Sequence, residues 1–322
     1  MPSFIRNTSG GKAVSGGALA PRSRRGNTNQ VDAYWRGGVG DVLEIYYLVV
    51  AGGGGGAGAS NWGDGGGSGG GGAGGYKTSY GTVNAGGQPI GVALLSLNGT
   101  TATVTVGGGG GGGAGNTGWN GTPHGSAGSS STMGTITSTG GQGGFIRTSG
   151  AKAGSFGYET NSSNSGHWGI GGASGAGSAG GNASGLGTHG TAGIGLSNSI
   201  TGTSVDRGGA GGNQLQYNSN GGQLSTPNTS GGFGGGAGGV SGGSGTAGSG
   251  NTGGGGGGGG FYPYGYQGAG GAGGSGVVVI RYLNSFGTLA SIGGGLTSST
   301  SVDGDYRVYQ FTAGTGSIVF PS

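Results

Sequence analysis

Glycine makes up 103 of the 322 residues, and it occurs in uninterrupted runs at Gly52–Gly56, Gly107–Gly113 and Gly253–Gly260. Ordering a glycine costs more backbone entropy than ordering any other residue. At roughly 1–2 kcal/mol for each residue, a folded chain of this composition must recover on the order of 100–200 kcal/mol over its glycines alone. Glycine has no side chain that could supply this free energy, so the compensation must come from backbone hydrogen bonds.

The remaining composition excludes several classes of protein. Apolar residues make up 30% of the chain and charged residues 6%, against about 45–50% and 25% in ordinary domains, so most of the length cannot bury a conventional core. Three scattered histidines, few carboxylates and no cysteine provide no spacing typical of a metal site or of acid–base catalysis. We expect no enzymatic activity, no cofactor and no metal site.

Strand-like runs lie on both sides of the glycine-rich part. Residues 41–50 precede the first glycine run, and residues 277–282, 306–311 and 317–320 follow the last one; all are short and rich in β-branched and aromatic residues. No stretch has a helical period of useful length. We therefore predict an all-β plus irregular fold, in which short strands flank a body of packed polyglycine II helices and α-helix is essentially absent. The strands near 42–50 and 277–282 should pair where the chain enters and leaves this body.

Three regions follow from this reading: an N-terminal attachment arm at 1–41, the glycine-rich body with its flanking strands at 42–282, and a C-terminal β segment at 283–322. Within the body, Asn98-Gly99 separates two β-prone runs, 90–97 and 100–106. An Asn-Gly pair between such runs is the strongest short signal of a β-hairpin. Alternation of threonine with Ala102, Val104 and Val106 predicts one polar and one apolar face for the second run.

A polyglycine II helix has three residues per turn and no internal hydrogen bonds. Its glycine N–H groups can instead bond sideways to neighbouring helices, and each such bond contributes roughly 0.5–1.5 kcal/mol. The packing predicts a period of three, which the glycines at positions 236, 239, 242, 245 and 248 follow. The proline content of collagen is missing, since the chain has only seven prolines.

Aromatic residues between the glycine runs are the candidate binding residues. Rigid aromatics among Gly, Ser and Asn resemble antibody paratopes in composition, because they provide contact area at low entropy cost. The alternative is that they cap the ends of the glycine helices. The receptor-binding candidates are Trp62, Trp119, Trp168, Phe261, Tyr262, Tyr264 and Tyr266.

The basic residues are concentrated in the arm, where Arg22, Arg24 and Arg25 are candidates for attachment to a particle. Contact with nucleic acid is the alternative that we consider less favoured. The longest apolar run, Ile45–Ala51, is too short to span a membrane. A short repeat, in which the segment beginning at Phe4 is similar to the segment beginning at Phe145, has no evident role.

The flanking segments resemble a known family. Tyr47-Leu-Val-Val-Ala-Gly-Gly-Gly-Gly-Gly56, the body, Gly273-Gly-Ser-Gly-Val-Val-Val-Ile-Arg-Tyr282 and the closing segment Tyr306–Phe320 are similar to the glycine-rich domain of bacteriophage virion proteins. The resemblance covers residues 42–320. The body also resembles the distal adhesins of T-even-like phages, in which polyglycine II helices display variable loops that bind the host surface.

This resemblance implies a tail fibre or tail-tip adhesin, assembled in the host cytoplasm and located in the virion. Its partners would be other virion proteins of the fibre shaft, tail or capsid, and a host surface glycan or outer-membrane protein. A homotrimer or a cap on a trimeric fibre is implied, without nucleic acid or membrane insertion. Two alternatives stay open: a capsid or tail decoration protein that binds no receptor, and a glycine-rich cell-wall or matrix protein.

Overall fold

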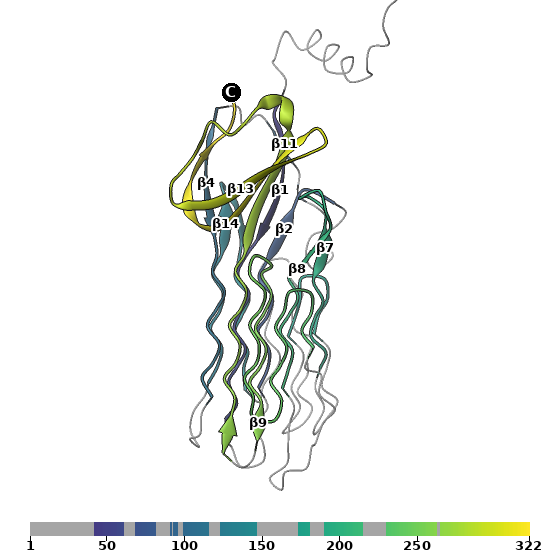
Figure 1. The fold of residues 1–322 in the computed structure, drawn as a ribbon, viewed down its shortest axis with the longest axis vertical. Helices are drawn as coiled ribbons and strands as arrows, with labels where there is room; N and C mark the ends of the chain where they lie inside the picture. The colour runs from purple at the N-terminus through teal and green to yellow at the C-terminus, as the bar shows by residue number, and fades with distance from the viewer. Residues whose placement is uncertain are drawn as a thin grey trace, which may run out of the picture. The chain divides into compact units, whose positions relative to one another are not determined.

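The computed structural model describes residues 42–60, 68–81, 91, 93–95, 99–115, 123–146, 173–180, 190–214, 230–262 and 265–322. Residues 43–322 form one compact unit. In this unit a large antiparallel sheet lies at one end, and the glycine-rich body extends from it as a set of long side-by-side segments (Figure 1). The described residues contain no α-helix, and their single helical turn is the short 3-10 segment η2, Asn284–Phe286. The predicted fold class is confirmed.

The main sheet has the strand order β2-β1-β11-β14-β4-β5-β6. The bounds are β1 Glu44–Val50, β2 Tyr76–Thr78, β4 Thr101–Val106, β5 Ser131–Met133, β6 Ile136–Ser138, β11 Val277–Leu283 and β14 Tyr306–Val319. Three strands lie off this path: β3 Leu94–Leu95 pairs with β1, and β12 Ser291–Ile292 and β13 Leu296–Asp303 pair with β14. Strands β1 and β11 pair antiparallel from Tyr46↔Arg281 to Val50↔Val277, which confirms the predicted pairing where the chain enters and leaves the body.

The hairpin predicted at Asn98-Gly99 is not found among the described residues, which leave out residues 96–98. Gly99 has the positive φ, 65°, that a tight turn needs, but the two flanking runs bond elsewhere. Strand β4 has β14 on one edge and β5 on the other, whereas β3 pairs with β1. Both edges of β4 are therefore occupied by strands distant in sequence, and these long-range pairings override the local turn signal. The predicted apolar face of β4 is confirmed, because Val104 is buried and Ala102 and Val106 pack against the core.

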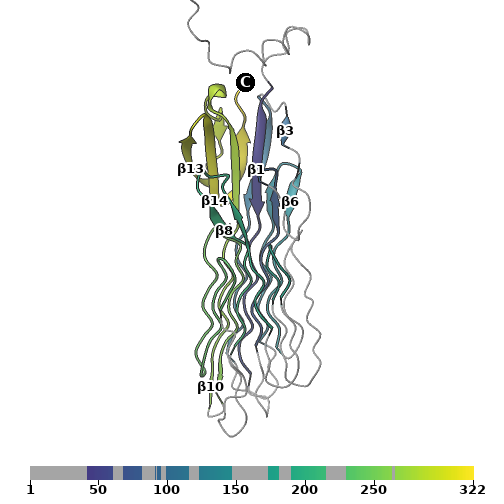
Figure 2. The ribbon, with the colours of Figure 1, turned by 90° about the vertical axis from the view of Figure 1, so that its right-hand side faces the viewer.

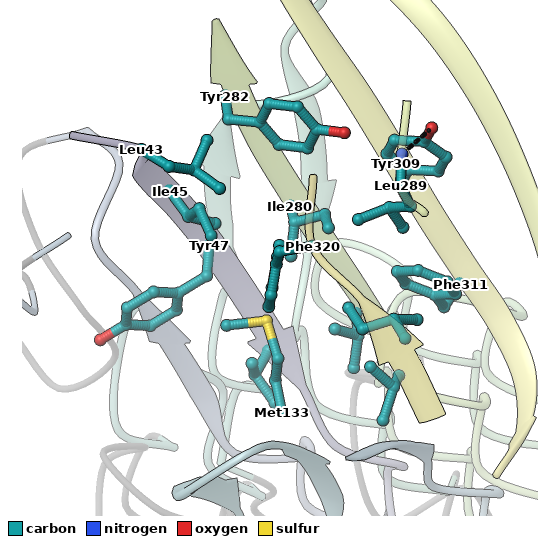
Figure 3. Packing of buried hydrophobic residues seen from close by; sticks show 14 residues of the cluster. Leu43, Ile45, Tyr47, Met133, Ile280, Tyr282, Leu289, Tyr309, Phe311 and Phe320 are labelled. Carbon is teal, nitrogen blue, oxygen red and sulfur yellow. Dashed lines mark hydrogen bonds between the residues drawn. The ribbon is translucent and has the colours of Figure 1, made fainter. Parts of the chain in front are cut away.

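The sheet is buried on both faces at its centre. One face carries Ile45, Tyr47, Ile280 and Phe311 within a larger cluster (Figure 3). On the opposite face, β1 contributes Leu48 and Val50 and β11 contributes Val277 and Val279 to a second cluster. This cluster also contains Tyr76 and Ile200. Burial of both faces explains why residues 45–50 and 277–280 form continuous apolar runs without polar alternation.

The body is a lattice of extended segments joined by backbone hydrogen bonds. Along residues 52–55 the acceptors are, in order, the carbonyl oxygens of Ser129, Gly274, Gly72 and Ser126, at 2.8–3.0 Å. The fourth residue thus returns to the neighbour that the first one used, as a helix with three residues per turn requires. Counting bonds in both directions, segment 51–59 contacts six neighbours: 68–75, 107–115, 123–130, 139–146, 253–260 and 268–274. Segment 253–260 repeats the three-residue cycle along residues 255–258.

The close packing explains the glycine content. A Cβ added to any glycine of segment 51–59 would lie 1.9–2.2 Å from a backbone oxygen of a neighbouring segment. In segment 107–115, at the edge of the lattice, only every third residue (107, 110 and 113) is buried. In segment 243–250, Gly245 and Gly248 face the centre, whereas Ser244, Thr246, Ala247 and Ser249 are exposed. Side chains are therefore accepted only on the outward positions.

The period of three predicted for positions 236–248 holds with one correction. Gly236 and Gly239 donate to Gly255 and Gly258, and Gly245 and Gly248 donate to Ala269 and Ala272. Gly242 does not belong to either segment, since it lies in the turn between them with a φ of 78°. Four of the five glycines thus come from two adjacent segments, and Gly242 lies in the turn between them.

Candidate binding surface at the end of the glycine-rich body

A small hairpin closes the end of the body that is opposite the main sheet (Figures 1 and 2). Segment 253–260 leads directly into β9, Phe261–Tyr262, and β10, Tyr266–Gln267, begins the return. The two strands pair antiparallel with Tyr266 opposite Tyr262 and Gln267 opposite Phe261. Gly265, with a φ of 104°, lies in the connecting turn. The hairpin thus continues the lattice and holds two tyrosines side by side.

A second turn, residues 240–243, packs over this hairpin. A Cβ on Gly242 would lie 2.7 Å from Cβ of Tyr266 and 3.3 Å from Cβ of Tyr262, so only glycine fits there. The Gly243 N–H donates to the Val240 carbonyl at 2.8 Å, and the Gly243 carbonyl accepts from Gly260 N–H at 2.7 Å. These bonds tie the turn to the central segment 253–260.

Three side chains are thereby brought to the surface at this end, and we call Val240, Tyr262 and Tyr266 the tip cluster. Tyr266 is 70% exposed and Val240 50% exposed, while Tyr262 is partly buried. Successive side chains of a strand point to opposite faces. Phe261 therefore points inward, opposite to Tyr262, and is 1% exposed. The expectation of an exposed aromatic is wrong for Phe261, which fits the capping alternative.

Sequence reasoning missed Val240. The signal that could have found it is an isolated β-branched residue in Gly238-Gly-Val-Ser-Gly-Gly243, because a large apolar side chain between glycines must lie at an outward position or in a turn. Two more apolar side chains are exposed along the body, Ile194 at 51% and Phe233 at 46%. Phe233 lies at the other end of its segment, where its carbonyl accepts from Gly209 N–H.

Four candidate binding residues, Trp62, Trp119, Trp168 and Tyr264, lie outside the described residues, as do the attachment candidates Arg22, Arg24 and Arg25. The structure does describe the residues on both sides of 61–67, the segment that contains Trp62. Ala59 donates to Gly268 at 2.9 Å, and Ser68 Oγ donates to the Gly259 carbonyl. Both therefore lie beside the base of the hairpin, next to the start of β9 and the end of β10.

The surroundings of the tip cluster offer little acid–base chemistry. No group of three or more His, Asp or Glu side chains that could hold a metal ion occurs in the described part of the chain. His124 packs edge-on against Phe145, with 5.2 Å between ring centres. Among the described residues, no helix has the length and apolar character needed to cross a membrane.

Two ionisable groups whose pKa is shifted by burial lie near the main sheet. Burial raises the pKa of Tyr76, while the nearby Arg207 acts in the opposite direction; burial in turn lowers the pKa of Arg207. Arg281 is paired with Asp303 at 2.7 Å and stacks on the ring of Tyr306 at 4.5 Å. These contacts hold the groups in local packing, so we assign them a structural role.

Comparison with known proteins gives one match. The sequence model of a family described as a glycine-rich domain matches residues 28–283. No curated protein and no solved structure matches the chain.

Proposed function

We propose that this chain, which belongs to the glycine-rich domain family, is a bacteriophage virion protein, a tail fibre or tail-tip adhesin that binds the host surface through the end of its glycine-rich body. The virion assignment rests on the resemblance of the segments 47–56, 273–282 and 306–320 to phage virion proteins. The observation that carries this proposal is the tip cluster. Its exposed tyrosine and valine are fixed on a lattice whose central segments are fully buried and saturated with backbone hydrogen bonds.

The physical argument is one of pre-organisation. Binding orders side chains and loops at a cost of about 0.5–1.5 kcal/mol for each immobilised side chain. A tyrosine has two side-chain torsions, and here its backbone is held by the hairpin pairing and by the turn at Gly242. Aromatic rings of this kind stack on sugars and on apolar protein surfaces, so a host glycan or an outer-membrane protein is the proposed ligand.

In this proposal the arm at 1–41 attaches the body to other virion proteins of the fibre shaft, tail or capsid, with Arg22, Arg24 and Arg25 as the contact residues. The protein would be assembled in the host cytoplasm and carried in the virion. It would act as a binding protein without catalysis and without a cofactor.

An adsorption assay tests the proposal. The purified full chain should bind host cells and block phage adsorption, and Tyr266→Ala with Val240→Ser should reduce binding at least about tenfold, as loss of central contacts does in other interfaces. Phe233→Ala is the matched control, since it removes an exposed aromatic at the other end of its segment. If the tip variant blocks adsorption as well as the unmodified chain does, receptor binding by the tip cluster is wrong. If an antibody against this chain labels the capsid surface of intact virions, the decoration protein is favoured instead.

A further inference from the structure

Strand β13 is exposed along nearly its whole length. Residues 297–302 are all exposed, although successive side chains of a strand point to opposite faces. Only Leu296, at the start of the strand, packs against the core, and residues 297–302 cover no core on either face. In the described structure its one pairing partner is β14, from Leu296↔Gly314 to Asp303↔Tyr306. Its other edge leaves a row of backbone N–H and C=O groups open to water.

The other open strands of this sheet differ from β13 in length. Strands β2 and β6, at the two ends of the strand order, have three residues each, and the side strands β3 and β12 have two each. Very short edge strands are one of the ways in which proteins prevent unwanted pairing; lysine, proline and inward-pointing charges are others. Strand β13 has eight residues, and residues 296–302 read Leu-Thr-Ser-Ser-Thr-Ser-Val, without any charge or proline.

The strand is also held in place. Its end is fixed by the Asp303 carboxylate, which accepts from the Arg281 guanidinium at 2.7 Å, and Arg281 is buried. The turn to β14 contains Gly304 with a φ of 57°. A shift of register lies between Thr297 and Ser298, which leaves Ser298–Val302 as the regular, uncharged part. A rigid and unprotected edge is the kind of template to which a further strand adds.

We propose that β13 pairs antiparallel with β13 of a second copy of this chain, about a twofold axis at Thr300. Self-pairing follows from complementarity, because an antiparallel strand pair related by a twofold axis exchanges the same N–H and C=O groups in both directions. The register places Thr300 opposite Thr300, Ser299 opposite Ser301 and Ser298 opposite Val302. Ser and Thr pairs across strands are favourable. The Asp303 carboxylates of the two copies then lie at opposite ends of the paired stretch, where they do not repel each other.

The inference is independent of receptor binding by the tip cluster. It also differs from the homotrimer that the resemblance implies, because a twofold contact of this kind closes with two copies. The mass of the purified protein in solution therefore distinguishes the proposed dimer from the homotrimer.

Cysteine substitution tests the register directly, since the chain has no cysteine. Directly opposite residues have Cα atoms about 4.5–5.5 Å apart, within the range that a disulfide spans. In the purified full chain, Thr300→Cys should form a disulfide-linked dimer under mild oxidation. Val302→Cys is the matched control: residue 302 is 53% exposed, but its counterpart would lie about 13 Å away along the strand. A mixture of the Ser298→Cys and Val302→Cys chains should form the crossed dimer.

The expected result is a two-copy mass by native mass spectrometry and crosslinking of Thr300→Cys at least about tenfold faster than that of Val302→Cys. The double variant Ser299→Lys, Ser301→Lys should be a monomer. Its thermal midpoint should equal that of the unmodified chain in its monomeric form. A mass of one or three copies at all concentrations overturns the proposal, as does equal crosslinking at positions 300 and 302.

Discussion

Substitution of Gly55 by alanine should separate the central segment 51–59 from its neighbour 107–115. A Cβ at position 55 would lie 2.1 Å from the carbonyl oxygen of Gly111, whereas ordinary contact begins at 3.4 Å. Segment 107–115 would have to move away by about 1.3 Å. The matched control is Gly111→Ala at the other side of the same contact, because its Cβ meets only Ser126 Oγ at 4.0 Å and points outward.

The movement would break hydrogen bonds that are now well formed. Gly110 N–H donates to the Gly53 carbonyl at 2.9 Å, and Gly113 N–H donates to the Gly56 carbonyl at 2.8 Å. Lengthened to about 4 Å, neither contact is a hydrogen bond, and each of the two broken buried bonds costs about 1–3 kcal/mol. Gly55→Ala should therefore destabilise the fold by about 2–6 kcal/mol. Gly111→Ala should stabilise it by about 0.4–1 kcal/mol, because alanine lowers the entropy of the unfolded chain.

Chemical unfolding of the two variants, followed by circular dichroism, measures both free energies. The two substitutions are identical in chemistry and differ only in the side of the contact on which the methyl group lies. If Gly55→Ala costs less than about 1 kcal/mol, or if both variants shift stability equally, the lattice does not depend on the missing Cβ atoms and the account of the glycine content is refuted.

Two further predictions concern buried aromatics. Phe261→Ala should cost about 3–5 kcal/mol, as truncation of a buried phenylalanine does, whereas Tyr266→Ala should change stability by less than about 0.5 kcal/mol; thermal unfolding of the pair checks both. Burial raises the pKa of Tyr76 in the folded chain, so its stabilising contribution is present below the ordinary tyrosine pKa of about 10 and is lost as the pH rises above it. Tyr76→Phe should therefore retain more stability above pH 10 than the unmodified chain, which a pH series of thermal midpoints measures; an unchanged alkaline loss would contradict this.

Much of the fold could be predicted because its signals are local and repetitive. The glycine runs and their period of three specify segments that bond sideways, and the apolar runs at 45–50 and 277–280 specify strands buried on both faces. Pairing between these two strands followed from their positions before and after the body. Such inferences need only the residue types and their spacing.

The remaining features depend on contacts between distant segments. The Asn98-Gly99 turn predicted a hairpin, but the choice of partners for β4 is set by β5 and β14, which no local pattern identifies. The tip cluster likewise needs the turn at Gly242 to pack on the hairpin of Tyr262 and Tyr266. Aromatic content alone could not separate the buried Phe261 from the exposed Tyr266. The difference comes from the alternation of side chains along the strand and from the lattice beneath it.

The C-terminal strand supports a final prediction, about where the folding unit ends. The family match stops at residue 283, and the sequence suggests a boundary at 282. Strand β14, however, lies between β11 and β4 in the main sheet. A fragment of residues 42–282 would lose this strand, and with it the strand pairing that joins the β2-β1-β11 part to the β4-β5-β6 part.

The buried residues Val308, Tyr309, Phe311 and Ile318 would be lost with β14. At about 1.5–3 kcal/mol for each buried side chain, the loss is about 6–12 kcal/mol, comparable to the whole stability of a typical domain. We therefore expect the 42–282 fragment to be degraded by a protease that leaves the 42–322 fragment intact. A protease-resistant 42–282 fragment with an unchanged circular dichroism spectrum would show instead that the hydrogen bonds of the glycine lattice hold the body together without the sheet.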